Sequence, residues 1–109
     1  HTPVSPAKER SVRKVSVVLP GWISKAEAQE EVIRDLRARA LLKLEFYRSK
    51  MRLFEAKHAT TFPRFQKKVE KSGREDFTAW DELIEWEAHY RAYQEWKKRH
   101  TELQKWSGI

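Results

Sequence analysis

The side chains that come closest to a metal-binding arrangement lie in the last third of the chain. Glu82, Glu85 and His89 are spaced three and four residues apart, so a helix would place them on one face, where they could contact a cation. A solvated acidic face explains the same spacing. No second histidine stands at metal-site spacing, and no inward-facing Glu-x-x-His pair of the di-iron type is found. We therefore expect no metal site.

Other catalytic chemistry lacks the residues that it needs. The chain has no cysteine, which removes thiolate nucleophiles, thiolate metal sites and disulfides. Its three glycines form no phosphate-binding loop or nucleophile elbow, and no paired buried carboxylates can be identified. The sequence predicts a protein that has no enzymatic activity and no cofactor.

The composition fits one small helical domain. Of the 109 residues, 36% are charged and 12% are aromatic, and the formal net charge is +7. No stretch approaches the roughly 20 apolar residues of a membrane span, and the N-terminus lacks a signal-peptide core. We expect a soluble cytoplasmic protein with a mobile arm at residues 1–10 and a single helical domain at residues 11–109.

The helical pattern has two long segments and one short one. Ser24-Lys25-Ala26-Glu27 is a capping box, and it predicts a helix from Ser24 to about Lys57, with a break near Ala40 as the alternative. A short helix is expected from Phe62 to Lys71, with proline in its first turn. An aromatic helix is expected from about Phe77 to Arg99. The two long helices would form an antiparallel hairpin, joined by the short one.

The aromatic helix carries two apolar arcs. Phe77, Trp80, Ile84 and Ala88 lie on one arc, and Leu83, Trp86, Tyr90 and Tyr93 lie on the other. One arc fits one neighbour, so the second must be covered by another segment of the chain or by another molecule. We assign Trp80 and Ile84 of the first arc to the core. Trp86, Tyr90 and Tyr93, with Glu82 and Glu85 beside them, are the predicted partner-binding surface, which would suit a basic protein.

The predicted core draws on all three helices. Its ten residues are Val32, Leu36, Leu44, Tyr47, Met51, Phe54, Phe62, Phe65, Trp80 and Ile84. Charge should help to orient the hairpin, because the segment 34–57 holds eight basic and three acidic residues whereas the segment 76–96 holds one basic and six acidic. We expect Arg37, Arg39 and Lys43 to lie near Glu82, Glu85 and Glu87, although exposed ion pairs contribute only about 0–1 kcal/mol each.

A single β-strand is predicted before the first helix, from Val12 to Leu19. Its residues alternate, and its β-branched side chains favour an extended backbone. A lone strand cannot satisfy its own backbone groups, so its simplest partner is the same strand of a second chain. In such a two-stranded ribbon Arg13, Lys14 and Ser16 are the candidate contacts to the major groove of DNA.

Two stretches resemble known classes of protein. The strand ending at Val18-Leu19-Pro20 and the capped helix after it resemble the ribbon-helix-helix class of DNA-binding proteins over about thirty residues, although that class has a short first helix followed by a glycine-containing turn. A wider similarity links the chain to small uncharacterised prokaryotic proteins, some encoded beside toxin genes. It is carried by the segments 18–22, 40–47, 54–57 and 75–81, with Phe62 and Phe65. Where those proteins have Tyr-Gly, this chain has His58-Ala59.

The wider resemblance implies a helical antitoxin of a type II toxin-antitoxin pair, which neutralises a protein partner. We prefer this function because the aromatic helix supports it. The acidic aromatic helix would lie in the cationic groove of a basic toxin. The alternative is a dimeric DNA-binding transcriptional regulator that uses the N-terminal ribbon. A homodimer is expected for either function, and the two could coexist in one dimer.

Overall fold

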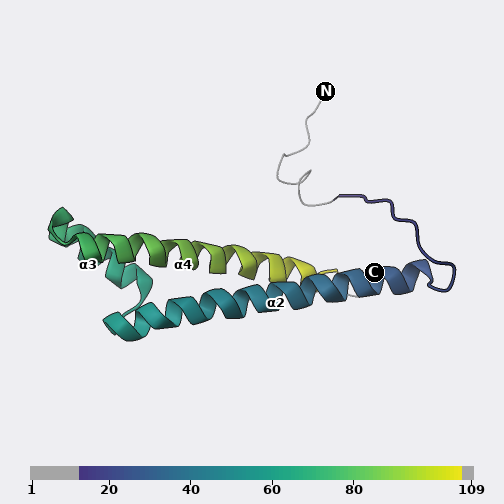
Figure 1. The fold of residues 1–109 in the computed structure, drawn as a ribbon, viewed down its shortest axis with the longest axis horizontal. Helices are drawn as coiled ribbons and strands as arrows, with labels where there is room; N and C mark the ends of the chain where they lie inside the picture. The colour runs from purple at the N-terminus through teal and green to yellow at the C-terminus, as the bar shows by residue number, and fades with distance from the viewer. Residues whose placement is uncertain (1–12, 107–109) are drawn as a thin grey trace, which may run out of the picture.

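The computed structural model describes residues 13–106, and this part of the chain is a helical hairpin. Helices α2 (Lys25–His58) and α4 (Phe77–Gln104) run side by side in opposite directions (Figure 1). Helix α3 (Phe62–Ser72) and the 3-10 helix η1 (Gly73–Glu75) connect them at what we call the closed end of the hairpin. The opposite end is the open end. The mainly helical fold predicted from the sequence is confirmed.

Helix α2 begins at the predicted capping box. The backbone N–H of Glu27 donates to Ser24 Oγ at 3.1 Å, and the N–H of Ser24 donates to Glu27 Oε1 at 3.3 Å. These two bonds satisfy amides that have no partner within the helix. The helix runs unbroken through Ala40, whose side chain is fully buried. It ends at Ala59, which adopts a left-handed backbone conformation with φ of 53°.

Helix α4 is capped at both ends by side chains. The Asp76 carboxylate accepts a hydrogen bond from the N–H of Ala79 at 3.0 Å at the start of α4. Helix α3 ends at Gly73, whose positive φ of 75° favours glycine. At its other end α4 continues five residues past the predicted end at Arg99. The Arg37 guanidinium of α2 donates to the Leu103 carbonyl at 3.1 and 3.3 Å, which satisfies a carbonyl of the last turns.

The core gathers at the closed end around one tryptophan. The ring of Trp86 lies 5.4 Å from that of Phe54, 5.2 Å from Phe65 and 5.8 Å from Phe62, so three helices meet on it. The cluster of buried side chains is Met51, Phe62, Phe65, Val69, Leu83 and Trp86. The predicted core positions of Met51, Phe62 and Phe65 are therefore confirmed.

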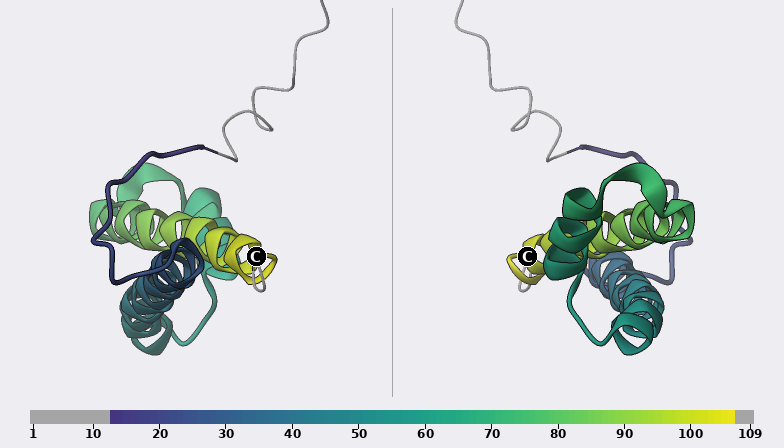
Figure 2. Two further views of the ribbon diagram at one scale, coloured as in Figure 1. Left: turned by 90° about the vertical axis from the view of Figure 1, so that its right-hand side faces the viewer. Right: turned by 90° about the vertical axis from the view of Figure 1, so that its left-hand side faces the viewer.

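Three other predicted core residues are exposed. Val32, Leu36 and Ile84 all face solvent, and Leu44, Tyr47, Phe54 and Trp80 are half-buried. On α4 the prediction for Ile84 is wrong, because Ile84 is outside the core whereas Leu83 and Trp86 are in it. The physical reason is α3, which brings Phe62 and Phe65 against the arc that contains Trp86. Trp80, the other predicted core residue of this helix, packs against the core cluster. The view along the hairpin shows α3 lying across its closed end (Figure 2).

The predicted charge pairing between the long helices was also wrong. Lys57 and His58, at the end of α2, meet Glu82 near the start of α4. Arg37 lies near the other end of α4, where it binds a backbone carbonyl. Because α2 and α4 run in opposite directions from the closed end, the last turns of α2 lie beside the first turns of α4. The connection therefore sets which charges meet.

The predicted strand is not found. Residues 13–20 form neither helix nor strand, and no strand occurs anywhere in the described part of the chain. Val15, Val17 and Val18 are exposed, Val18 almost completely. The first residue of the predicted strand, Val12, and the arm at residues 1–10 lie outside the described residues. Pairing of this segment between two chains stays a prediction.

Replacing Trp86 by alanine should cost about 3–5 kcal/mol of unfolding free energy, because it leaves a large cavity where three helices meet. Trp22→Ala is the matched control, since Trp22 is 81% exposed whereas Trp86 is 0% exposed. Urea unfolding followed by far-ultraviolet circular dichroism measures both. A loss below about 1 kcal/mol for Trp86→Ala would contradict the central place of this residue in the core.

Candidate functional site

The residue at the centre of the predicted partner-binding surface, Trp86, is not exposed in the folded chain. Trp86 is fully buried, and Tyr90 and Tyr93 are half-buried against the core cluster. The rings of Tyr90 and Phe62 stack with their centroids 4.7 Å apart. The side chains that were expected to meet another molecule thus meet α2 and α3 instead.

Glu82, which was expected on the rim of that surface, points into the hairpin. Lys57 Nζ donates to Glu82 Oε1 at 2.7 Å, and His58 Nε2 donates to Glu82 Oε2 at 2.6 Å. The hydrogen bond from Lys57 and then that from His58 hold the pKa of the Glu82 carboxyl below its ordinary value of 4.5. Both oxygens are therefore engaged within the chain, and Glu82 clamps the end of α2 to α4.

The acidic trio considered for cation binding is not assembled. Glu82 faces α2, Glu85 is exposed, and the ring of His89 lies against Tyr47 and Phe54, with centroids 6.1 and 6.4 Å apart. Within residues 13–106 no three His, Asp or Glu side chains come together as metal ligands would. The three side chains thus take different directions from the same helix.

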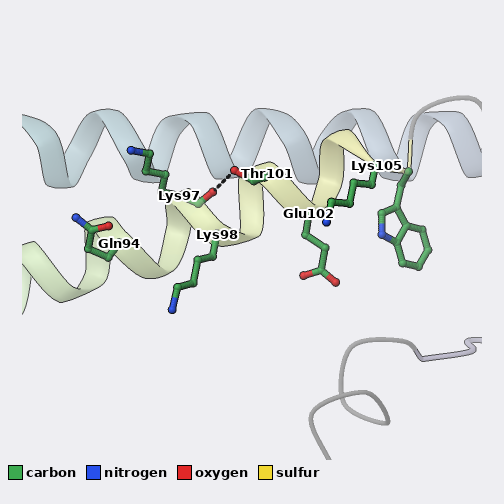
Figure 3. A pocket seen from close by; sticks show the side chains of 7 residues that line it. Gln94, Lys97, Lys98, Thr101, Glu102 and Lys105 are labelled. Carbon is green, nitrogen blue, oxygen red and sulfur yellow. Dashed lines mark hydrogen bonds between the residues drawn. The ribbon is translucent and has the colours of Figure 1, made fainter.

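A hollow on the last turns of α4 gathers several cations but no converging groups. Its lining comes from that one helix: Gln94, Lys97, Lys98, Thr101, Glu102, Lys105 and Trp106. Figure 3 shows the side chains of Lys97 and Lys98 leaving the helix in different directions, while the Thr101 hydroxyl donates to the Lys97 carbonyl at 2.9 Å. An open hollow on one side of a helix does not hold a substrate in a fixed orientation.

The outer side of α2 carries a stripe of exposed apolar side chains. Leu42 is 71% exposed, Phe46 50% and Leu53 67%. They are spaced four and seven residues apart, so they lie on one face of the helix, away from the buried Ala40 and Met51. We call these three residues the outer stripe of α2. Large apolar side chains exposed along one face of a helix are typical of a site that binds another protein.

Sequence reasoning missed the outer stripe although a signal for it was present. The apolar pattern of α2 was assigned to one face only, the face that includes Leu44 and Met51. Leu42, Phe46 and Leu53 do not fit that face, and their own spacing of four and seven residues corresponds to one and two turns of a helix. A second pattern on the same helix was the sign that α2, like α4, has two apolar faces.

The candidate nucleic-acid contacts lie on one extended segment of the chain. Arg13, Lys14 and Ser16 are all exposed in the extended segment before α2. Between this segment and α2 the backbone makes a turn, in which the N–H of Ile23 donates to the Pro20 carbonyl at 3.3 Å. Nothing in the described chain therefore fixes how these side chains would meet a groove.

Comparison of the chain with known protein families, with curated proteins and with solved structures finds no match. Among the described residues no helix is both long enough and apolar enough to cross a membrane.

The lowered pKa of Glu82 predicts a specific acid sensitivity. A group whose pKa is depressed by folding contributes stability that is fully present above its unfolded pKa, about 4.5, and is lost as the pH falls through its folded pKa. Glu82→Gln removes this contribution, so its unfolding free energy should fall less between about pH 5 and pH 3 than that of the parent protein. Urea unfolding at several pH values measures this.

Glu70→Gln is the control, because Glu70 is exposed and makes no ion pair within residues 13–106. It should keep the acid sensitivity of the parent. An identical pH dependence for Glu82→Gln and the parent would show that the clamp on α2 does not contribute to acid unfolding.

Proposed function

We propose that the protein is a non-enzymatic binding protein of the antitoxin type, which holds and neutralises another protein. The observation that carries this proposal is the outer stripe of α2, three large apolar side chains exposed on the face of a long helix that already has a neighbour on its other face. The sequence resemblance to proteins encoded beside toxin genes supports the same class.

The shape of the stripe favours a helix as the element that binds it. Leu42, Phe46 and Leu53 extend over three turns, roughly 16 Å at 1.5 Å per residue. Amphipathic helices dock through residues of the same spacing, with apolar side chains three or four residues apart. Phe46, at the centre of the stripe, is the anchor that a partner would cover most completely.

The charges beside the stripe favour an acidic partner. Lys50 lies on one side of it, and Glu45 and Arg52 lie on the other. Lys43 is turned toward α4 instead, with its Nζ 6.0 Å from the centre of the Trp96 ring. Lys50 Nζ lies 5.4 Å from the centre of the Phe46 ring, so this cation is part of the apolar surface itself. The net positive flank replaces the negative rim that was expected around Trp86. We therefore propose a partner helix with carboxylates beside its apolar face, in place of the basic partner first expected.

A second candidate function is DNA binding through a ribbon made by two chains. It is favoured by one observation: the segment that would form the ribbon is exposed and unpaired with any strand of the described chain. Val15, Val17 and Val18 would gain cover, and the backbone would gain hydrogen bonds, if two copies of it met. In this arrangement Arg13, Lys14 and Ser16 would contact the duplex.

The binding function is tested by co-expression with the protein encoded by the gene adjacent to its own. The parent protein should form a complex with that product and relieve its effect on cell growth. Phe46→Glu should weaken the complex about tenfold or more, because it removes an apolar anchor and adds a charge that repels an acidic partner.

Leu41→Glu is a closely matched control. Leu41 is 50% exposed, the same fraction as Phe46, and it lies on the same helix but about 140° away from Phe46 around its axis. It should bind as the parent does. Equal losses for both variants would exclude the outer stripe as the binding surface, and no complex with the adjacent gene's product would reject the antitoxin role.

The ribbon is tested by binding to duplex DNA at several salt concentrations. If Lys14 contacts phosphate, affinity should fall steeply with salt, and Lys14→Ala should lower both the affinity and the salt dependence. Lys25→Ala, at the exposed start of α2, is the control for loss of one charge. Affinity that is indifferent to salt and to Lys14 would exclude this use of the segment.

A further inference from the structure

We infer that two copies of the protein pair through α4, with the acidic first half of one α4 beside the basic last half of the other. The face of α4 that would pair is set by spacing. At 100° per residue, seven side chains fall within an arc of about 80°: Asp81, Glu85, Ala88, Ala92, Trp96, Arg99 and Leu103. We call this arc the pairing face.

The pairing face is exposed in its acidic half and bordered by α2 in its basic half. Asp81, Glu85, Ala88 and Arg99 are exposed, and Ala92, Trp96 and Leu103 are half-buried. Lys43 Nζ of α2 lies 6.0 Å from the centre of the Trp96 ring, at the edge of the face. The face points away from Leu83 and Tyr90, which contact the core. Helix α3 therefore does not reach it. At its centre are two alanines, and small side chains let two helix backbones approach closely.

The order of residues along this face is the same from both ends. The spacing of its residues is symmetric about Ala92. From Ala92 toward the N-terminus, the next residues of the face follow at intervals of four, three and four, and the same intervals separate the residues toward the C-terminus. Two antiparallel copies centred on Ala92 would therefore place each residue opposite a defined residue of the other copy. A pair of this kind has two-fold symmetry, in which every contact is made twice.

The residues that this dimer would bring together are complementary. Glu85 would lie opposite Arg99 of the second copy, so each dimer would gain two ion pairs between a carboxylate and a guanidinium. Ala88 lies opposite Trp96 of the second copy, so a small side chain faces a large one. A parallel arrangement would instead set Glu85 against Glu85 and Arg99 against Arg99, which opposes pairing. The charge order therefore selects the antiparallel pair.

A groove beside the pairing face offers a second cation for the same carboxylates. It has a volume of about 410 Å³ and lies between α2 and α4 at the open end, lined by Ile33, Leu36, Arg39, Trp96, Arg99, Glu102, Leu103 and Trp106. Arg39 and Arg99 are exposed there beside apolar side chains. Asp81 of the second copy, opposite Leu103, would be in reach of Arg39, so both carboxylates of the acidic half gain a guanidinium.

The charged groups on this face have little to hold them within one chain. Among residues 13–106 neither Asp81 nor Glu85 makes an ion pair, and Arg39 makes none. Arg99 lies 3.6 Å from Glu95 on the exposed surface and stacks on Trp96, with its guanidinium carbon 4.5 Å from the ring centre. That stacking presents the guanidinium at the position where Glu85 of the second copy would lie. The basic partner expected for the acidic helix is thus a second copy of the chain.

This inference does not depend on the proposed function, because it uses α4 and the groove, whereas the outer stripe lies on the far side of α2. The assembly is measured by sedimentation equilibrium of the full chain. The parent should behave as a particle of twice the chain mass of 13.1 kDa, with a dissociation constant that rises with salt.

Charge reversal tests the pairing itself. Arg99→Glu alone and Glu85→Arg alone should each raise the dimer dissociation constant about tenfold or more, because each sets like charges opposite one another twice. The double variant with both reversals should restore the affinity of the parent. Lys98→Glu is the control, since it makes the same charge change one residue away and off the pairing face. It should leave the dissociation constant unchanged.

Circular dichroism of each variant confirms that the helices are retained. A parent protein that stays monomeric up to millimolar concentration would overturn the inference. So would a double variant that fails to restore pairing, or an equal effect of Lys98→Glu. A dimer that responds to Phe46→Glu but not to Arg99→Glu would place the interface on the outer stripe and would also overturn it.

Discussion

The contact on which the rest of this structure depends is the packing of Phe54, Phe62 and Phe65 around Trp86. These four rings come from three helices, and the centroids of the three phenyl rings lie within 6 Å of that of Trp86. Burying one tryptophan and its aromatic neighbours contributes several kilocalories per mole in a domain whose net stability is of the order of 5–15 kcal/mol. Without this cluster α3 would lose the apolar contacts that hold it against α4.

Burying Trp86 also has an energetic cost, because its polar indole N–H is buried together with the ring. The indole N–H of Trp86 is buried and has no hydrogen-bond partner. An unsatisfied buried donor costs about 1–3 kcal/mol. The large apolar area of the ring outweighs this cost, so Trp86 is in the core for its volume and shape. His58, which contacts both Phe65 and Trp86 while it binds Glu82, links the apolar cluster to the ionic clamp on α2.

Much of the fold could be predicted from the sequence because its signals are local. The capping box at Ser24, the turn before Phe62 and the cap at Asp76 each depend on residues within one turn of the chain, and all three helices begin where these signals stand. The end of α4 was less clear, because it is held by Arg37, a residue far away in the sequence.

The candidate site was harder to predict because it depends on which face of a helix is covered. Periodicity shows that α4 has two apolar arcs, but both arcs fit a core equally well. The choice is made by the docking of α3, and it places Trp86 inside and Ile84 outside. The same limit applies to Leu42 and Phe46, whose exposure follows from where α4 lies. The N-terminal segment poses a different problem, since a strand there would need a second chain.

The uneven core has a consequence for how the molecule opens. Apart from Ala40, every fully buried side chain of the described part belongs to the cluster at the closed end. Local opening is easiest where few apolar contacts must be broken, so the helices separate first at the open end, near Arg37 and Leu103. Amide hydrogens there exchange with solvent sooner than those near Trp86. The core cluster thus holds the two long helices together at the closed end, whereas the open end, which includes the groove beside Arg39, separates more easily.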